Sequence, residues 1–386
     1  MLSRRLLIVS LAIVVDPLIV EGYNPLVSTL KTAFNVNLEL ISLSLAFHML
    51  PLAALSLFSG ALSDLYHRPR ILMYGLLISC VGSLMGAASP NVTLFLLSRS
   101  IQGIGSALIM PIGAALIGDI TPKEELGRAF GVSAVVSGLL GVTLGPLVSG
   151  FLAGIEWRIV PLLFSLYSLT LAALGWATLK GIMAPSSGKR SPSYILKRIS
   201  DTARDRSIAA LSATGFLSFF TFQGMLPLIS DQLSLPPLSL EKAQIGMVFS
   251  AVGFTGMLSS LIGGFVADRL GGRRSLVLAF LIMTAPMLLL TQISAYGPYI
   301  LLLSSLASFN RLAFVSRNAL VVGLAPESRG TASSVFNFAG FLGFALAPAL
   351  LPRVYSSFGM NTIYILNASL LLISAILAST IRTGRE

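Results

Sequence analysis

The segment GALSDLYHRPR at residues 60–70 returns in altered form, as GGFVADRLGGRR, at residues 263–274. Both copies begin with small residues, carry one acid (Asp64 or Asp268) and end in a basic residue. Each copy follows the second apolar run of its half of the chain. A loop that recurs in corresponding positions is typical of chains built from internal structural repeats. The repeat therefore predicts two structurally related halves.

The residues around these loops are strongly apolar. Hydrophobic residues make up 55% of the 386 residues and charged residues only 11%, whereas soluble domains carry about 25% charged residues. Apolar runs of about 20 residues, long enough to cross a bilayer, recur from end to end. We therefore expect an all-α membrane protein with twelve transmembrane helices in two pseudo-symmetric six-helix halves. The expected helices cover residues 5–30, 40–63, 70–89, 92–118, 126–152, 157–179, 207–230, 241–266, 274–295, 298–324, 328–352 and 360–381.

The basic residues predict the orientation of these helices. The formal net charge of +11 would suggest a nucleic-acid partner in a soluble protein. Here most of the 26 Lys and Arg residues fall in alternate loops, and the other loops hold only Lys31, Arg158, Lys242 and Arg353. Because cytoplasmic loops carry an excess of Lys and Arg, both termini are expected in the cytoplasm. We expect a multi-pass protein of the cell (plasma or inner) membrane with no nucleic-acid partner.

A polar stretch separates the two halves. Residues 181–206 are rich in Ser, Pro and basic residues, which is typical of a linker. The expected organisation is a half at 1–180, a cytoplasmic linker at 181–206 and a second half at 207–386. Residues 194–199 mix apolar and basic side chains and could form a short surface helix; a plain solvated linker is the alternative.

Several function classes lack the residues they need. Cys80 is the only cysteine, and His48 and His67 are the only histidines, so the chain offers neither a disulfide nor a zinc-ligand spacing. It also lacks the Gly-Lys-Ser/Thr loop that binds ATP phosphates. We expect no metal, no cofactor and no enzymatic activity.

Two carboxyl groups fall within the first expected helix, in VVDPLIVEGYNPLV at 14–27. Asp16 follows Arg5 by about eleven residues, or roughly 16 Å, which places it near the bilayer midplane. Glu21 lies one to two turns further out. A carboxyl group in an apolar site is suited to take up and release a proton; permanent neutralisation by Arg99 or by neighbouring hydroxyl groups is the alternative.

Residues 1–20 resemble a signal peptide, but the internal acid and the lack of a small-residue cleavage site predict an uncleaved span.

A buried arginine is expected in the fourth helix, in RSIQGIGSALIMPIGAALIGD at 99–119. Arg99 lies about eight residues, roughly 12 Å, from the outer helix end. An arginine within a span costs at least about 2.5 kcal/mol unless it is paired or hydrated. We therefore expect a functional role for Arg99, with snorkelling to the outer interface as the alternative.

Glycine and proline recur in the fifth helix, in SGLLGVTLGPLVSG at 137–150. Gly141, Gly145 and Gly150 would leave a groove for close helix contact, and Pro146 would bend the helix. Ordinary packing of small residues is the alternative.

Together these four segments resemble the major facilitator superfamily, and they are most similar to its 12-helix drug:proton antiporter branch. The first loop differs from the family pattern by having His67 where glycine is usual. The resemblance implies a monomeric, proton-coupled exporter (antiporter) of small lipophilic or cationic compounds that works by alternating access. Its partners would be protons, a small-molecule substrate and the lipid bilayer.

An uptake symporter and a flippase or exporter of a lipid-like molecule are the alternatives, and the helix-5 pattern favours export. A non-transporting receptor or scaffold would not need Asp16 and Arg99 inside the bilayer.

The resemblance also suggests roles for individual side chains. Proton coupling is expected of Asp16, Glu21 and Arg99, with His48 as a backup carrier. The expected substrate cavity contains Asp16, Tyr23, Gln102, Phe220, Gln223, Asn310 and Arg311. The expected cytoplasmic gate contains Gly60, Asp64, Arg68, Arg70, Asp119, Arg128, Gly264, Asp268, Arg273 and Arg274. The helix-5 exporter motif is Gly141, Gly145, Pro146 and Gly150.

Three further expectations concern the second half and the gate. Arg317 is expected to snorkel to the cytoplasmic interface. The phenylalanines at 216–222 could line an apolar substrate pocket, with lipid or core contact as the alternative. Asp64 is expected to cap the eleventh helix near 326–329, and Asp268 to cap the fifth near 122–127.

Overall fold

The computed structural model describes residues 3–65, 67–179, 192–293, 295–325 and 329–381, with only the backbone given for 59–65, 123, 192–196 and 329. The described residues form helices and connecting segments, with no strand among them. Eleven of their helical segments are long and apolar enough to cross a membrane.

The last of these segments supplies two spans. Gly330–Ser379 has 50 residues, which is about 75 Å of helix and more than twice the hydrocarbon thickness of roughly 30 Å. The helix breaks at Gly359, where φ is 78°, a conformation that glycine adopts without a Cβ clash. The described residues therefore hold twelve spans, and the all-α fold expected from the sequence is confirmed.

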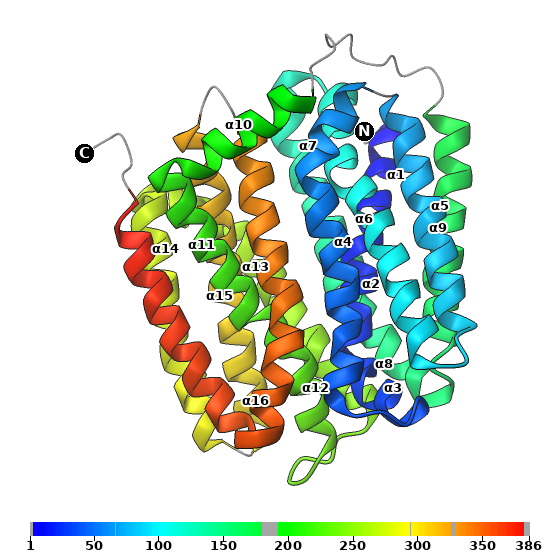
Figure 1. The fold of residues 1–386 in the computed structure, drawn as a ribbon, viewed down its shortest axis with the longest axis vertical. Helices are drawn as coiled ribbons and strands as arrows, with labels where there is room; N and C mark the ends of the chain where they lie inside the picture. Colours follow the sequence, from blue (N-terminus) through cyan, green and yellow to red (C-terminus); the bar gives the residue numbers. More distant parts are fainter. Residues whose placement is uncertain (1–2, 66, 180–191, 294, 326–328, 382–386) are drawn as a thin grey trace. The chain divides into compact units, whose positions relative to one another are not determined.

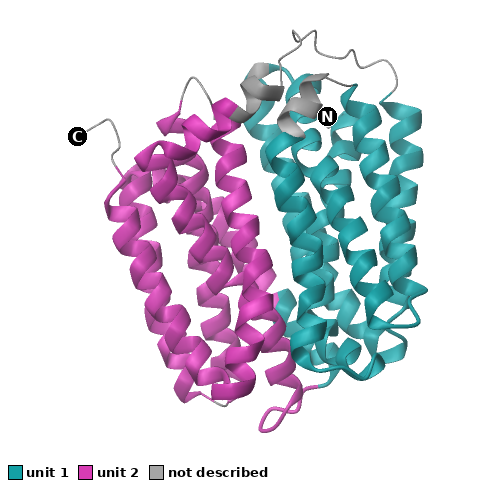
Figure 2. Ribbon diagram, viewed as in Figure 1, with its two compact units in different colours: residues 1–190, 241–250 teal, residues 191–240, 251–386 magenta. Residues whose placement is uncertain are grey.

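The chain divides into two compact units (Figure 2). The first consists of residues 1–190 and 241–250, and the second of residues 191–240 and 251–386. Each unit is built from helices that run roughly side by side (Figure 1).

The first unit contains the first six spans. Its elements are α1 (Arg4–Ile13), α2 (Val15–Tyr23), η1 (Asn24–Leu26), α3 (Val27–Ala33), α4 (Leu38–Leu65), α5 (Arg68–Ala87), α6 (Val92–Ile120), η2 (Lys123–Glu125), α7 (Leu126–Val136), η3 (Ser137–Leu144), α8 (Gly145–Ile155) and α9 (Ile159–Thr178). Helix α6 packs against α1, α4 and α5, so its buried side chains meet those of three other spans.

The second unit contains the remaining spans and a surface helix. Its elements are α10 (Pro192–Arg204), α11 (Arg206–Thr221), η4 (Gln223–Met225), α12 (Leu226–Ser234), most of α13 (Lys242–Leu270), α14 (Gly272–Leu289), η5 (Leu290–Gln292), α15 (Tyr296–Leu324) and α16 (Arg329–Ser379). The formation of α10 decides between the two interpretations of the linker in favour of a short helix.

The first span of each unit is interrupted at a similar place. A short 3-10 segment, η1 or η4, separates the two parts of the span in each unit, and a proline (Pro25 or Pro227) stands within it or just after it. Proline has no N–H for the helical ladder and so favours an interruption. Pro17 likewise follows the break between α1 and α2 at Val14. Asp16 therefore lies beside a boundary between two helical segments of the first span.

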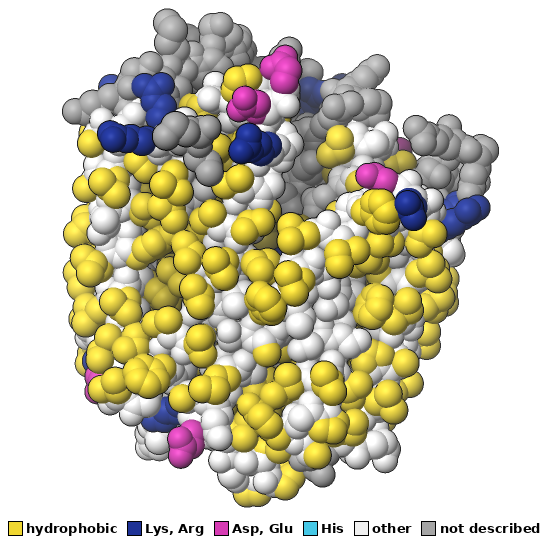
Figure 3. Space-filling model, turned by 180° about the vertical axis from the view of Figure 1, so that it is seen from behind, with side chains coloured by type: hydrophobic (Ala, Val, Ile, Leu, Met, Phe, Trp, Pro, Cys, Tyr) yellow, Lys and Arg dark blue, Asp and Glu magenta, His cyan; other side chains and the backbone are white. Residues whose placement is uncertain are grey.

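The surface matches a bilayer environment. On the face shown in Figure 3, hydrophobic side chains cover the middle, and charged side chains gather towards the two ends. Large apolar side chains such as Phe151, Leu301 and Ile376 are more than half exposed. In water such a surface would be an aggregation liability, whereas in lipid it is the expected exterior.

Candidate functional site

Asp16 of α2 and His48 of α4 form a buried pair inside the first unit. Nε2 of His48 lies 3.1 Å from Oδ1 of Asp16. His48 is completely buried and Asp16 is 6% exposed. Nδ1 of His48 has no hydrogen-bond partner among the described residues. The pair thus combines two titratable groups at hydrogen-bonding distance with a free nitrogen on one of them.

Arg99 of α6 lies in the same interior. It is 1% exposed, so the snorkelling alternative is wrong. Its Nη1 donates to Oε1 of Gln102, and its Nε donates to the Ser44 carbonyl at 3.4 Å. The guanidinium carbon lies 4.1 Å from the centre of the Tyr23 ring, which is a cation–π geometry. Gln102 in turn donates to Ser83 Oγ at 2.8 Å, so groups from α2, α4, α5 and α6 hold the guanidinium in place.

Helix α4 links the carboxylate to the arginine. Arg99 binds the carbonyl of Ser44, and Asp16 contacts His48 one helical turn later. Asp16 and Arg99 form no direct ion pair among the described residues, but both are buried and both contact the same turn of α4. Asp16 and Arg99 were expected to act together, and in the structure His48 and the α4 backbone lie with them.

Glu21 has a separate environment. It is 8% exposed and accepts a hydrogen bond of 2.9 Å from Nδ2 of Asn24. The ring of Tyr23 packs edge-on against Phe95 and Phe164, each at 5.7 Å between ring centres. The two acids of the first span are therefore held by different partners.

Glycines allow the polar network to be packed this tightly. A Cβ added to Gly103 in α6 would overlap the carbonyl of His48, and one added to Gly82 in α5 would lie 2.8 Å from the backbone nitrogen of Gln102. The absence of side chains at these positions lets α4 and α5 approach α6 closely.

Replacement of Gly103 by alanine is expected to destabilise the protein by about 1–3 kcal/mol, the usual cost of overpacking. The new methyl group meets backbone atoms of His48, which cannot move without shifting α4. Thermal unfolding in detergent measures the change. Gly118→Ala on the same helix is the matched control, because nothing lies within 4 Å of its added Cβ. Equal melting temperatures for the two variants would contradict the packing role.

The glycines of the fifth span contact two other helices of the first unit. A Cβ on Gly141 would lie 2.9 Å from Pro17 Cγ, and one on Gly145 would lie 3.1 Å from Leu18 Cδ1. A Cβ on Gly150 would lie 2.7 Å from Cα of Gly246, at the start of α13. The span also widens into a π-helix, η3, just before Pro146. Gly141 and Gly145 of the expected helix-5 motif therefore pack against Pro17 and Leu18, which follow Asp16 in the chain.

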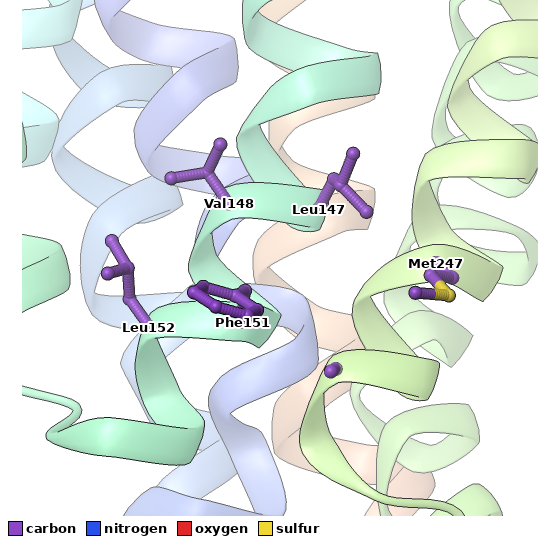
Figure 4. Close-up of a pocket in the computed structure, with 6 residues that line it drawn as sticks. Leu147, Val148, Phe151, Leu152 and Met247 are labelled. Carbon is purple, nitrogen blue, oxygen red and sulfur yellow. The ribbon is translucent and has the colours of Figure 1, made fainter.

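An apolar groove lies between α8 and the start of α13 (Figure 4). Its volume is about 260 Å³. The lining residues are Leu147, Val148, Phe151, Leu152, Ala243 and Met247. Phe151 and Met247 are more than half exposed, so the groove opens to the side of the unit.

One ion pair appears among the expected gate residues that the structure describes. Nη1 of Arg68, at the start of α5, lies 2.6 Å and 2.7 Å from the two carboxylate oxygens of Asp119, at the end of α6. Arg273 donates to the Ile381 carbonyl at 3.3 Å. Exposed side chains are found at Arg70, Arg128, Asp268 and Arg274, and Gly264 has open space around it. The side chains of Gly60 and Asp64, and residues 326–328 at the expected cap, lie outside the described residues.

The expected cavity residues of the second unit lie on α11, η4 and α15. Phe220 and Asn310 are buried, and Gln223 and Arg311 are half-buried. Ser218 Oγ donates to Asn310 Oδ1 at 2.7 Å. The expectation for Arg317 is wrong: it is 1% exposed and donates to the Thr214 carbonyl at 3.1 Å. Its side chain points into the unit, so it cannot reach an interface.

Sequence reasoning missed a polar cluster at the end of the seventh span. The expected helix stops at 230, but α12 continues to Ser234 and buries Asp231 to 3% exposure. The hydroxyl groups of Tyr299 and Tyr364 each lie 2.9 Å from Gln232 Oε1 and 2.7 Å from each other. Asp231 and Gln232 directly follow residue 230, so the apolar pattern carried no signal for this continuation of the helix.

Comparisons with known proteins agree with this architecture. The model of the Major Facilitator Superfamily matches residues 9–241 and 208–386. The chain is 27% identical to the MFS-type transporter YceJ of Bacillus subtilis over 380 residues, which covers 94% of this chain and 93% of that one. It is 35% identical to multidrug resistance protein 3 of the same organism over 100 residues, or 26% of this chain and 19% of that protein.

A solved structure shares the fold. A bacterial homolog of the human lysosomal transporter Spinster, in an inward-facing and occupied conformation, superposes with a TM-score of 0.80 over 97% of this chain and 96% of that one, at 14% identity. Together with the family match over nearly the whole length, the two six-span sets place this chain, a multi-pass transporter, in the Major Facilitator Superfamily.

Proposed function

We propose that this transporter exports small lipophilic or cationic compounds in exchange for protons, and that the Asp16–His48 pair is its proton-binding site. The observation that carries the proposal is the buried contact of 3.1 Å between these two side chains, one turn of α4 away from the carbonyl that Arg99 binds. Buried titratable groups within a span are functional candidates, because a bilayer makes them costly to keep for packing alone.

The charges of the site support an exchange mechanism. In this proposal an ionised Asp16 and the guanidinium of Arg99 balance each other, and a neutral His48 of α4 lies beside Asp16. A proton on the pair adds one positive charge, and so does a cationic substrate beside Asp16. Two added charges in a medium of low dielectric constant would repel strongly. A site that holds either a proton or a substrate, but not both, gives antiport.

The proposal extends to the whole chain. Residues 1–180 and 207–386 would rock against each other around the site, with both termini cytoplasmic and a monomer as the working unit. Glu21 is the second candidate for the proton carrier, because it is also buried. The gate residues, including the Arg68–Asp119 ion pair, would close the cytoplasmic side in the outward-open state.

A lipid-like substrate is a second candidate, favoured by one observation. The groove between α8 and α13 is lined only by apolar side chains and opens to the side of the first unit (Figure 4). An acyl chain fits such a surface without desolvating a polar group.

Proteoliposomes with an imposed pH gradient test the proposal. A permanently charged fluorescent cation should accumulate in vesicles whose interior is more acidic than the bath, because protons that leave would drive the cation inwards. Permanent charge excludes passive trapping by pH, and an ionophore clamps the membrane potential. Protein-free vesicles are the control.

Each other outcome has a meaning. Loss of preloaded cation under the same gradient would indicate symport. Movement of a fluorescent lipid that ignores the gradient would favour the lipid-like substrate. No movement of any member of a panel of dyes and cations would contradict the proposed function.

A further inference from the structure

Arg317 of α15 is a buried cation that the proton site does not use. It is 1% exposed, and among the described residues its one hydrogen bond goes from Nη1 to the Thr214 carbonyl at 3.1 Å. Its Nε has no partner among the described residues. A guanidinium remains protonated and presents five N–H donors, so most of its donor capacity is directed at no described acceptor.

The two buried arginines differ in how their charge is balanced. Arg99 contacts Gln102 and the face of Tyr23, and the acid Asp16 contacts α4 one turn from the carbonyl that Arg99 binds. Arg317 has no carboxylate partner among the described side chains. An uncompensated charge inside a membrane protein is costly. An anion would compensate the charge of Arg317.

Aromatic side chains surround this cation. The guanidinium carbon of Arg317 lies 6.0 Å from the ring centre of Phe219 and 5.9 Å from that of Phe280. The Phe219 ring also contacts three more phenylalanines, with ring-centre distances of 5.9–6.4 Å: Phe314, Phe341 and Phe344. Of these rings, Phe219, Phe314 and Phe341 are only half-buried. An apolar ring surface is therefore accessible next to a guanidinium that lacks a counter-ion.

We propose that Arg317 and the phenylalanine cluster of α11, α15 and α16 form a binding site for an organic anion. The ligand would carry one carboxylate or sulfonate group on an aromatic or aliphatic body. Its oxygens would accept from the free donors of Arg317, which makes charge-assisted hydrogen bonds. Its body would pack on Phe219, Phe314 and Phe341. A change of the Phe219 rotamer would open the way to the guanidinium, and such side-chain changes are common on binding.

This site is distinct from the proposed proton pair, and anion binding needs no pH gradient. It goes beyond the proposed function, which concerns lipophilic and cationic compounds. Anion binding is measured on protein in detergent, where no transport takes place. A negative binding result would therefore contradict only the anion site, and a negative transport result would contradict only proton coupling.

Three probes separate the features of the ligand. Benzenesulfonate has both the anion and the ring, benzyl alcohol has the ring without charge, and methanesulfonate has the anion without the ring. Equilibrium dialysis and melting temperature are measured on the purified full-length protein at fixed sodium concentration. Benzenesulfonate should bind saturably and raise the melting temperature, whereas the other two should do neither at the same concentration. Equal binding of benzyl alcohol would overturn the proposal.

Variants locate the site. Arg317→Gln should weaken benzenesulfonate binding by about tenfold or more, the size expected for a charged hydrogen bond. Arg269→Gln, which removes an exposed cation of the second unit, should leave binding unchanged. Equal affinity in wild type and Arg317→Gln would overturn the proposal. If Arg317→Gln does not fold, Phe219→Leu decides, because unchanged binding after loss of the central ring would also overturn it.

Discussion

Replacement of Asp16 by asparagine is expected to abolish substrate-induced proton release while leaving the protein folded. Asparagine has nearly the same shape and can still hydrogen-bond Nε2 of His48, which lies 3.1 Å from Asp16. It cannot ionise, so a bound substrate would have no proton to displace. A pH indicator in a weakly buffered solution of detergent-purified protein measures the release, and substrate binding is measured separately.

Two further variants make this result specific. Glu156→Gln removes an exposed carboxylate of the same unit and should release as many protons as wild type. Glu21→Gln decides between the two buried acids. If Asp16→Asn and wild type release equal amounts, Asp16 has no part in coupling, and the assignment moves to Glu21 or His48.

Replacement of Arg99 by alanine is expected to impair coupling and to lower the free energy of unfolding by about 3–5 kcal/mol, as for a broken buried charge pair. The change removes hydrogen bonds to the Ser44 carbonyl and to Gln102. It also removes the buried positive charge that would balance an ionised Asp16 in the proposed mechanism. Arg99→Lys keeps the positive charge but loses the planar set of guanidinium N–H donors. It should therefore impair coupling less, and lower the free energy of unfolding less, than Arg99→Ala.

Thermal unfolding and proton release, measured side by side, check this expectation. Arg158→Ala is the control, because it removes an exposed arginine that stacks on Trp157 in the same unit. Its effect should be below about 1 kcal/mol, as for other surface contacts. An Arg99→Ala protein as stable and as well coupled as the control would show that the buried network does not serve the proton site.

The spans could be predicted from the sequence because hydrocarbon thickness and hydropathy act on each segment separately. The expected helix at 92–118, for example, is α6 at Val92–Ile120. The repeat at 60–70 and 263–274 also predicted two sets of spans correctly. Even so, the seventh span was ended too early, which left Asp231 outside the helix that buries it.

Side-chain partners could not be predicted in the same way. His48 and Asp16 are 32 residues apart, and only the packing of α4 against α6, with Gly103 at the contact, brings His48 to its place. The direction of Arg317 depends on how α15 is rotated against α11. Tertiary packing fixes that rotation, and the apolar pattern of a membrane helix contains little information about it.

The left-handed residue in α16 has a practical consequence. Gly359 is the one residue with non-helical backbone angles within Arg329–Ser379, so the junction between the last two spans has no extended loop to offer to a protease, an antibody or an inserted tag. An insertion there would have to unwind the end of a helix, whereas residues 235–241 between α12 and α13 form a connection outside the helices. Epitopes and cleavage sites for following this protein in a membrane belong in that connection.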